Sequence, residues 1–213
     1  MKVKSATIQN HLLIERATQS DVPEVAHLHV HVFPGFFLTS LGTSFLEELY
    51  RGFLAHPSGI FIIAREAGRL VGFAAGTSAP DVFFPDLRRR RRVAFAIKAI
   101  PAILKNPLPV CRKLLHAIKY RGETPVPVAR SSCALLSSIG VAETCRGSGL
   151  ARRLIAAFER EAALHGAGFV YLTTDAHSND RVNGFYAANG YTAVSRFLQS
   201  GKREMFRYEK SLS

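Results

Sequence analysis

The N-terminal part of the chain alternates between short apolar runs and segments whose apolar residues recur at helical spacing. Residues 12–17, 60–64 and 70–75 have the length and composition of β-strands. The last two runs flank residues 66–69, which include Gly68, so the pattern predicts a β-hairpin there.

Two helices are predicted between the first strand and this hairpin. Asp21 and Glu24 have the spacing of a capping box, with Asp21 as the N-cap, so a helix is expected to begin there. Pro34 and Gly35 end it. Residues 41–54 then carry leucine and phenylalanine on one helical face, which predicts a second helix.

The C-terminal half repeats this alternation. Residues 133–141 are apolar on both faces, which is typical of a buried strand in the middle of a sheet. The segments that follow are a helix after residue 149 that ends at Gly166, a strand at 169–174, a helix that ends at Gly190, and a hairpin of residues 191–198 and 202–208. This order of elements predicts an α/β (α+β) protein.

Length and composition fit a single domain spanning residues 1–213. The three cysteines form no CxxC pair, which argues against a disulfide framework or a zinc site and suits a reducing cytoplasm. Residues 1–4 are not followed by a long apolar segment, and no run reaches the roughly 20 residues of a membrane span. These features predict a cytoplasmic protein.

The positive charge is confined to one segment. Between Leu87 and Gly122 there are eleven basic residues, including five consecutive arginines at 88–92, and no acidic residue; the other 17 basic residues nearly balance the 16 acidic ones. We interpret residues 85–122 as a basic helical insert. Three roles remain open for this insert: a solvated lid or a packing helix pair, a lid that attracts an anionic acceptor, and a peripheral membrane contact through the region of residues 88–92. Basic and aromatic residues do not alternate, so no nucleic acid is expected.

A glycine-rich turn carries the first chemical signal. It follows the strand 133–141, opens a helix, and consists of Arg146, Gly147, Ser148, Gly149, Leu150 and Ala151. Its glycines let the backbone approach a ligand, and the first N–H groups of the helix can bind an anion. The turn lacks the third glycine that the dinucleotide-binding motif requires. It also lacks the Gly-Lys-Ser/Thr of the Walker motif. An ordinary turn and a pyrophosphate site both fit this turn alone.

A second motif lies downstream. Asn179 and Tyr186 are seven residues apart, so they share one face of a helix, and Gly190-Tyr191 follows. Residues 132–209 resemble the GNAT acetyltransferases, because they combine the motifs R-G-x-G-x-A, N-x7-Y and G-Y. One departure is Val182, where a small residue often stands in the family.

The resemblance implies a GNAT fold, with a central mixed, mostly antiparallel sheet flanked by helices and the insert between the third and fourth strands. It also implies acetyl-CoA as co-substrate. The loop from Arg146 to Ala151 would hold the pyrophosphate, and the backbone of Ile139 and Val141 would pair with the pantetheine arm. Gly140 between them is expected to ease a β-bulge.

By the same resemblance, Asn179 would bond the pantetheine and Tyr186 would act as general acid. The other interpretation of Tyr186 is a core tyrosine beside Phe185. The general base stays open, because strand residues 133–138 offer no carboxylate. Asp175 is the first candidate. The alternatives are Glu143, His31 and a water chain ending on serines such as Ser137 and Ser138.

The three histidines His27, His29 and His31 alternate along the chain, yet the expected helix aligns only the first and third, so no metal is predicted. The sequence therefore predicts an N-acetyltransferase acting directly from acetyl-CoA on a small or glycan-linked amine, as a monomer or homodimer. The alternatives are an acyl-CoA-binding module without catalysis and a protein that binds anions or membrane surfaces through the insert.

Overall fold

A computed structural model describes residues 12–105, 107, 132–199 and 203–212. Within them, seven strands form one sheet: β1 (Leu12–Arg16), β2 (Gly59–Glu66), β3 (Arg69–Thr77), β4 (Cys133–Val141), β5 (Phe169–Asp175), β6 (Thr192–Gln199) and β7 (Arg203–Ser211). Their order in the sheet is β1-β2-β3-β4-β5-β7-β6, and every neighbouring pair is antiparallel except β4 with β5.

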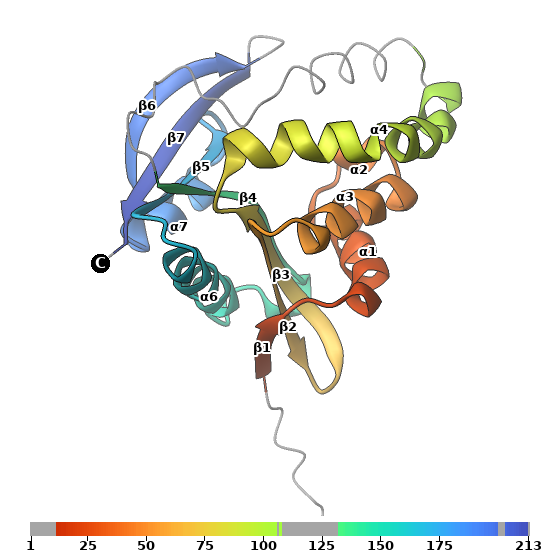
Figure 1. Cartoon of the computed structure of the whole chain (residues 1–213). Helices are drawn as coiled ribbons and strands as arrows, with labels where there is room; N and C mark the ends of the chain where they lie inside the picture. The colour runs from red at the N-terminus through yellow and green to blue at the C-terminus, as the bar shows by residue number, and fades with distance from the viewer. Residues whose placement is uncertain (1–11, 106, 108–131, 200–202, 213) are drawn as a thin grey trace, which may run out of the picture.

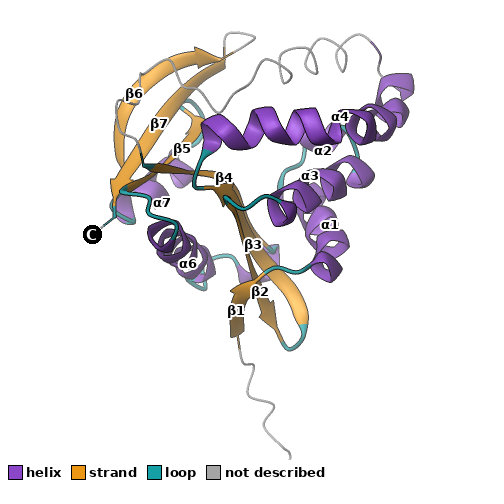
Figure 2. Cartoon of the chain, in the orientation of Figure 1, coloured by secondary structure: helices purple, strands orange, loops and turns teal. Residues whose placement is uncertain are grey.

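Helices cover both faces of this sheet (Figures 1 and 2). The helices are α1 (Val22–Val32), α2 (Phe37–Ser40), α3 (Thr43–Ala55), α4 (Pro80–Lys105), α6 (Leu150–Leu164) and α7 (Asp180–Ala188), with 3-10 turns η1 (Gln19–Asp21) and η2 (Glu143–Cys145). One face carries α6 and α7, and the other carries α1, α3 and α4. The predicted α/β fold with a mostly antiparallel sheet is therefore confirmed.

The two faces bury separate hydrophobic clusters, which explains the unbroken apolar runs of the inner strands. Ile60 and Ile62 of β2 pack under α6, with Leu154 and Phe158. Phe61 and Ile63, which alternate with these two isoleucines along β2, pack on the opposite face beneath α1 and α3. Because successive strand residues point to opposite faces, a strand covered on both sides must be apolar throughout.

The capping box lies one turn earlier than predicted. The carboxylate of Asp21 accepts hydrogen bonds from the backbone N–H and the hydroxyl of Thr18, both at 2.7 Å, which closes η1. Glu24 instead pairs with Arg65 of β2 at 2.8 Å. Asp21 is the N-cap residue of α1, as predicted, but the capping box with Glu24 does not form, because Arg65, far away in the sequence, pairs with the Glu24 carboxylate.

The basic insert is helical as far as the structure describes it. Helix α4 begins at Pro80, five residues before the predicted start, and runs to Lys105. It packs on α3 through Leu87, and its later turns bury Ala99 and Ala102 against Leu41 and Phe45. Of the predicted insert, residue 106 and residues 108–122 lie outside the described residues.

Candidate active site

Strands β4 and β5 separate partway along the sheet. Their pairing consists of Cys133 with Phe169, Ala134 with Val170 and Leu135 with Tyr171. Beyond these residues β4 stays paired with β3 as far as Val141, and β5 stays paired with β7 as far as Asp175. From residue 136 onward, β4 therefore presents an edge to which an extended ligand can add main-chain hydrogen bonds. Ile139, Gly140 and Val141 all lie on this segment.

A β-bulge occurs at this opening, at Ser137 rather than at Gly140. Ala75 of β3 pairs with Ser138 while Gly76 pairs with Leu136, so Ser137 is the extra residue. Gly76 allows this bulge, because a Cβ there would lie 2.0 Å from the carbonyl oxygen of Leu135. The prediction of a bulge at Gly140 was wrong.

Gly140 has a packing role instead. A Cβ on this residue would lie 2.8 Å from both the Phe73 ring and Val32 of α1. The missing side chain lets α1 lie close against the sheet, next to the place where the two strands separate.

The glycine loop joins β4 to α6. Gly147 and Gly149 have φ values of +82° and +81°, which L-residues with a side chain rarely adopt, and a Cβ on either would meet no atom within 4 Å. Their glycine identity therefore serves backbone conformation. Gly149 is the N-cap of α6 and supplies no side chain, so the first N–H groups of the helix face the loop.

The side chains of this loop are exposed. Arg146 pairs with Glu143 at 2.9 Å, and the Ser148 hydroxyl donates to the Cys145 carbonyl at 2.7 Å. Leu150, by contrast, is buried beneath α6, and Ala151 is half-buried. The loop thus combines an anchored start of the helix with exposed donors, which is what an anion site at a helix N-terminus requires.

Asn179 lies in the turn between β5 and α7, where it is tied to the end of β5. Its side-chain N–H groups donate to the Thr174 hydroxyl at 2.8 Å and to the Asp175 carbonyl at 3.1 Å. Both amide hydrogens are used, so the Oδ1 atom remains as an acceptor for a ligand N–H.

Tyr186 lies on α7, and its ring is 7% exposed. The ring packs edge-on against Tyr191 and beside Tyr208. Burial raises the pKa of its hydroxyl well above the usual value. The Tyr186 oxygen is not among the buried side-chain atoms of the described residues that lack a hydrogen-bond partner. The Tyr186 ring is therefore part of the hydrophobic cluster on the α6 face of the sheet.

The carboxylates considered as bases are engaged in ion pairs. Both oxygens of Asp175 accept hydrogen bonds from Arg203 of β7. Glu143 holds Arg146. His31 is exposed on α1, and its ring lies 2.7 Å from the carbonyl oxygen of His27. The described residues contain no group of three side chains able to hold a metal ion.

A buried polar group that sequence reasoning missed lies on the other face of the sheet. The Nδ1 atom of His29 on α1 is 2.7 Å from the Tyr50 hydroxyl on α3. The Ser138 side chain of β4 lies near the same hydroxyl. Nothing local in the sequence joins these three residues; the packing of α1 on both α3 and β4 brings them together.

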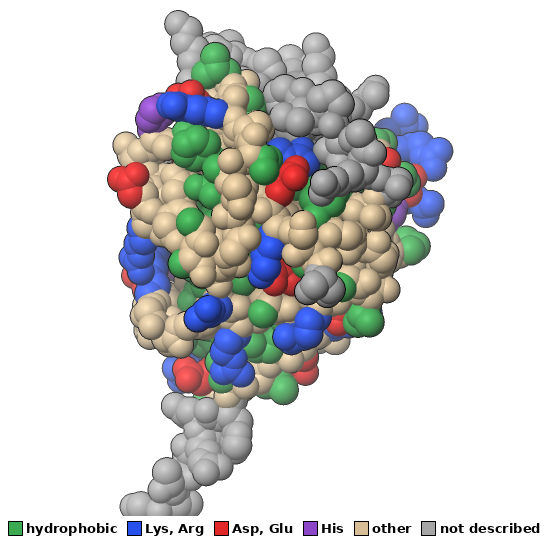
Figure 3. Space-filling view, turned by 90° about the vertical axis from the view of Figure 1, so that its left-hand side faces the viewer, with side chains coloured by type: hydrophobic (Ala, Val, Ile, Leu, Met, Phe, Trp, Pro, Cys, Tyr) green, Lys and Arg blue, Asp and Glu red, His purple; other side chains and the backbone are tan. Residues whose placement is uncertain are grey.

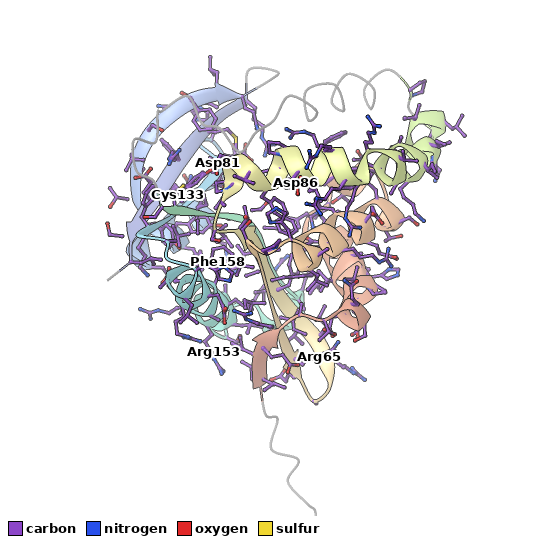
Figure 4. All side chains as sticks on the ribbon, viewed as in Figure 1. Arg65, Asp81, Asp86, Cys133, Arg153 and Phe158 are labelled. Atoms are coloured by element: carbon purple, nitrogen blue, oxygen red, sulfur yellow. The ribbon has the colours of Figure 1, made fainter. Side chains whose placement is uncertain are left out.

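The start of β4 lies beside the first turn of α4, where Figure 4 labels Cys133 and Asp81. The Cys133 thiol is half-buried, and this burial raises its pKa. Arg207 of β7 lies close enough to oppose that change and is itself fully buried, over the ring of Tyr171 at 4.1 Å.

Three consecutive arginines of α4 have acidic partners. Arg89 and Arg90 pair with Asp86 of the same helix, at 2.8 and 2.6 Å. Arg91 pairs with Glu48 of α3. The first two ion pairs lie within α4, and the third joins α4 to α3.

The family model described as the acetyltransferase (GNAT) family matches residues 22–191. No curated protein sequence matches the chain.

Several solved structures share the fold. A GNAT-family protein from Desulfovibrio desulfuricans has a TM-score of 0.63 at 17% identity, covering 95% of this chain and 100% of its own. The aminoglycoside N-acetyltransferase AAC(6′)-Iy in complex with CoA has a TM-score of 0.63 at 16% identity, covering 93% and 99%. A ribosomal-protein-alanine N-acetyltransferase from Brucella melitensis has a TM-score of 0.60 at 16% identity, covering 94% and 99%. Because the family model spans most of the chain, and the separated strands, glycine loop and fold agree with it, the chain belongs to the GNAT acetyltransferase family.

Proposed function

We propose that this protein transfers an acetyl group from acetyl-CoA directly to the amine of a small or glycan-linked acceptor, with both substrates bound together. The observation that carries the proposal is the free edge of β4 beyond Leu135, with the glycine loop at one end and Tyr186 on the neighbouring helix. A similar structure, AAC(6′)-Iy, was solved with CoA, which supports this donor.

The donor would lie along β4. Main-chain groups of Ile139 and Val141 would bond the pantetheine arm, and the Oδ1 atom of Asn179 would accept a pantetheine N–H. The pyrophosphate would lie against the N–H groups from Gly147 to Ala151. Arg146 would then exchange Glu143 for the phosphate, which offers a bidentate, doubly charged partner.

The reaction requires one bond to form and one to break. The neutral amine attacks the thioester carbon, and the C–S bond then breaks. The N–H exposed by the bulge at Ser137 would stabilise the oxyanion that forms between these events. The leaving thiolate needs a proton, which the Tyr186 hydroxyl would supply.

The raised pKa of Tyr186 is compatible with this role. A phenol near pKa 10 and a thiol near 8.5 are close enough for proton transfer in water. Burial disfavours both anions, so a thiolate formed beside the same apolar side chains also becomes more basic. Asp175 is our candidate for the general base, and it would have to leave Arg203 to accept a proton.

The alternative is an acyl-CoA-binding module that has lost catalysis. Calorimetry with acetyl-CoA, followed by thiol release with a panel of amines, separates the two. We expect binding and turnover with at least one amine. Binding without turnover on any amine would support the module, and absence of binding would contradict both.

Tyr186→Phe tests the general acid. We expect its turnover to fall by roughly 10²-fold or more while acetyl-CoA affinity stays within about twofold. The matched control is Tyr191→Phe, which removes a neighbouring hydroxyl that donates to Glu159 at 2.9 Å. The control should keep its turnover. A parallel loss of binding and turnover in Tyr186→Phe would show that the tyrosine is structural.

A second proposal concerns the outer face of α4, where four large apolar side chains are exposed: Val93 (64%), Ile97 (57%), Ile100 (49%) and Leu104 (79%). Their spacing puts them in one stripe, and Arg92, Lys98 and Lys105 flank it. We infer that this stripe binds the surface of an anionic membrane, because basic residues beside an apolar stripe fit anionic headgroups and acyl chains together. In the part of the chain that the structure describes, no helix is long and apolar enough to cross a bilayer. Sedimentation with anionic vesicles tests the proposal.

A further inference from the structure

Three side chains from distant parts of the chain meet beyond the point where β4 and β5 separate. Asp175 is the last residue of β5, past Tyr171, where the pairing with β4 stops. Both of its oxygens accept hydrogen bonds from Arg203 of β7. The Arg203 guanidinium in turn lies over the ring of Phe36, 5.4 Å from its centroid. Phe36 directly precedes α2, so the N-terminal helices and the last strands touch each other here.

These side chains lie on the face of the sheet opposite the proposed donor site. Tyr171 of β5 belongs to the cluster beneath α1 and α3, and the alternation along the strand brings Asp175 to the same face. Thr174, between them in this alternation, bonds Asn179 on the side of α6 and α7. The donor would therefore occupy one face of the opening. The pair of Asp175 and Arg203 lies on the other face, from which an acceptor can approach the thioester.

Arg203 keeps one edge of its guanidinium for a ligand. Its Nε atom and one terminal nitrogen donate to Asp175. No hydrogen bond to a described residue uses the other edge, which carries two parallel N–H groups. The Arg203 side chain is 46% exposed, and the Phe36 ring supports it from one side. An edge of this kind binds a carboxylate through two hydrogen bonds at once.

The Asp175 carboxylate decides which anion fits beside it. Asp175 and Arg203 place a negative and a positive group side by side, so a ligand with a single charge is attracted by one and repelled by the other. A ligand that carries both a carboxylate and an ammonium group complements both. A phosphate group, with a charge of about −2, would be repelled more strongly by Asp175 than a carboxylate is.

We infer that Arg203 binds a carboxylate of the acceptor, so that the acceptors of this protein are amino carboxylates whose amine lies between Asp175 and the open edge of β4. The inference rests on the proposed acetyl transfer and names its substrate class. Two carboxylates then share one guanidinium, so Asp175 is held less firmly and can take a proton from the ammonium. The neutral amine attacks the thioester carbon, the C–S bond breaks, and the nitrogen loses its second proton to water. Tyr186 protonates the thiolate and regains its proton from solvent.

The kinetic experiment compares each amino carboxylate with its own carboxamide. Glycine, β-alanine, γ-aminobutyrate and longer ω-amino carboxylates vary the distance between amine and carboxylate. We expect at least one acid to have a kcat/KM roughly tenfold or more above that of its amide, because the amide loses a charge-assisted pair of hydrogen bonds. Arg203→Gln should abolish this preference and leave acetyl-CoA affinity unchanged. Arg203→Lys keeps the charge without the forked geometry, so it should retain only part of the preference.

Arg196→Gln is the matched control. Arg196 of the neighbouring strand β6 is 49% exposed, pairs with Glu204 and lies over the Phe206 ring at 5.7 Å. It repeats the ion pair and the ring contact of Arg203, yet on the opposite face, since Phe206 packs against the cluster beneath α6. We expect Arg196→Gln to keep the preference for the acid.

Calorimetry tests the recognition of the carboxylate without turnover. Each amino carboxylate is titrated into protein saturated with CoA. We expect the wild-type protein to bind at least one of them, and Arg203→Gln to bind it at least about tenfold more weakly. The corresponding amide should bind the two proteins equally.

Several results would overturn the inference while acetyl transfer itself stands. They are equal kcat/KM for acids and amides, activity confined to amines without a carboxylate, the wild-type preference or affinity in Arg203→Gln, and loss of the preference in Arg196→Gln. If the wild-type protein binds acetyl-CoA but acetylates no amine at all, the proposed function fails and this inference with it.

Discussion

His29 shows how strongly one buried side chain can link stability to pH. An unfolded histidine titrates near pH 6.5, whereas burial lowers the pKa of His29 to about 4. Between these values the unfolded chain binds a proton that the folded protein does not. The contribution of His29 to stability is therefore complete above pH 6.5 and falls by about 3 kcal/mol as the pH drops to 4.

Denaturant unfolding of the wild-type protein and His29→Gln between pH 4 and 7.5 checks this prediction. We expect the free energy of unfolding of His29→Gln to vary less with pH, because its side chain cannot titrate. His31→Gln is the matched control, since His31 is exposed on the same helix. It should follow the wild-type curve. Equal pH slopes for the wild-type protein and His29→Gln would contradict the prediction.

At the scale of single elements, α6 offers a comparison within one helix. Gly149 before its first residue and Gly166 after its end have φ values of +81° and +80°, and a Cβ on either would meet no atom within 4 Å. Alanine at either position should therefore cost a similar amount of stability, about 1–2 kcal/mol, from the left-handed backbone alone.

Only the first of the two glycines is at the proposed donor site. We expect Gly149→Ala to weaken acetyl-CoA binding beyond its effect on stability, because the N–H groups at the start of α6 would move. Gly166→Ala should lose the same stability and keep its affinity. Calorimetry on both variants, with melting temperatures as the stability measure, provides the check; equal affinities would argue against a pyrophosphate site at Gly149.

The same elements show what a sequence can and cannot predict. The strands and helices were predictable because each carries its own periodicity, as with the apolar residues of β2 that alternate between two buried faces. The bulge was misplaced because its position depends on Gly76 of β3, about 60 residues away along the chain. The hydrogen bond between His29 and Tyr50 likewise joins two helices, and no local pattern encodes it.

For the molecule as a whole, the uneven charge separates one surface from the others. On the face shown in Figure 3, basic and acidic side chains are interspersed. On α4, by contrast, no acidic residue occurs from Leu87 to Lys105, and basic residues flank the exposed apolar stripe. A surface of this kind should bind anionic membranes more strongly than neutral ones, and added salt should weaken the binding.

Vesicle sedimentation tests this whole-molecule prediction. We expect the wild-type protein to bind vesicles containing phosphatidylserine and not those of phosphatidylcholine alone. The double variant Ile97→Ser/Leu104→Ser should bind at least about tenfold more weakly, since each buried side chain contributes roughly 1.5–3 kcal/mol. Leu198→Ser is the control, because Leu198 of β6 is 70% exposed outside the stripe. Equal vesicle binding by the double variant and by Leu198→Ser would contradict the prediction, and so would equal binding to both vesicle types. Helix α4 would then only pack on α3.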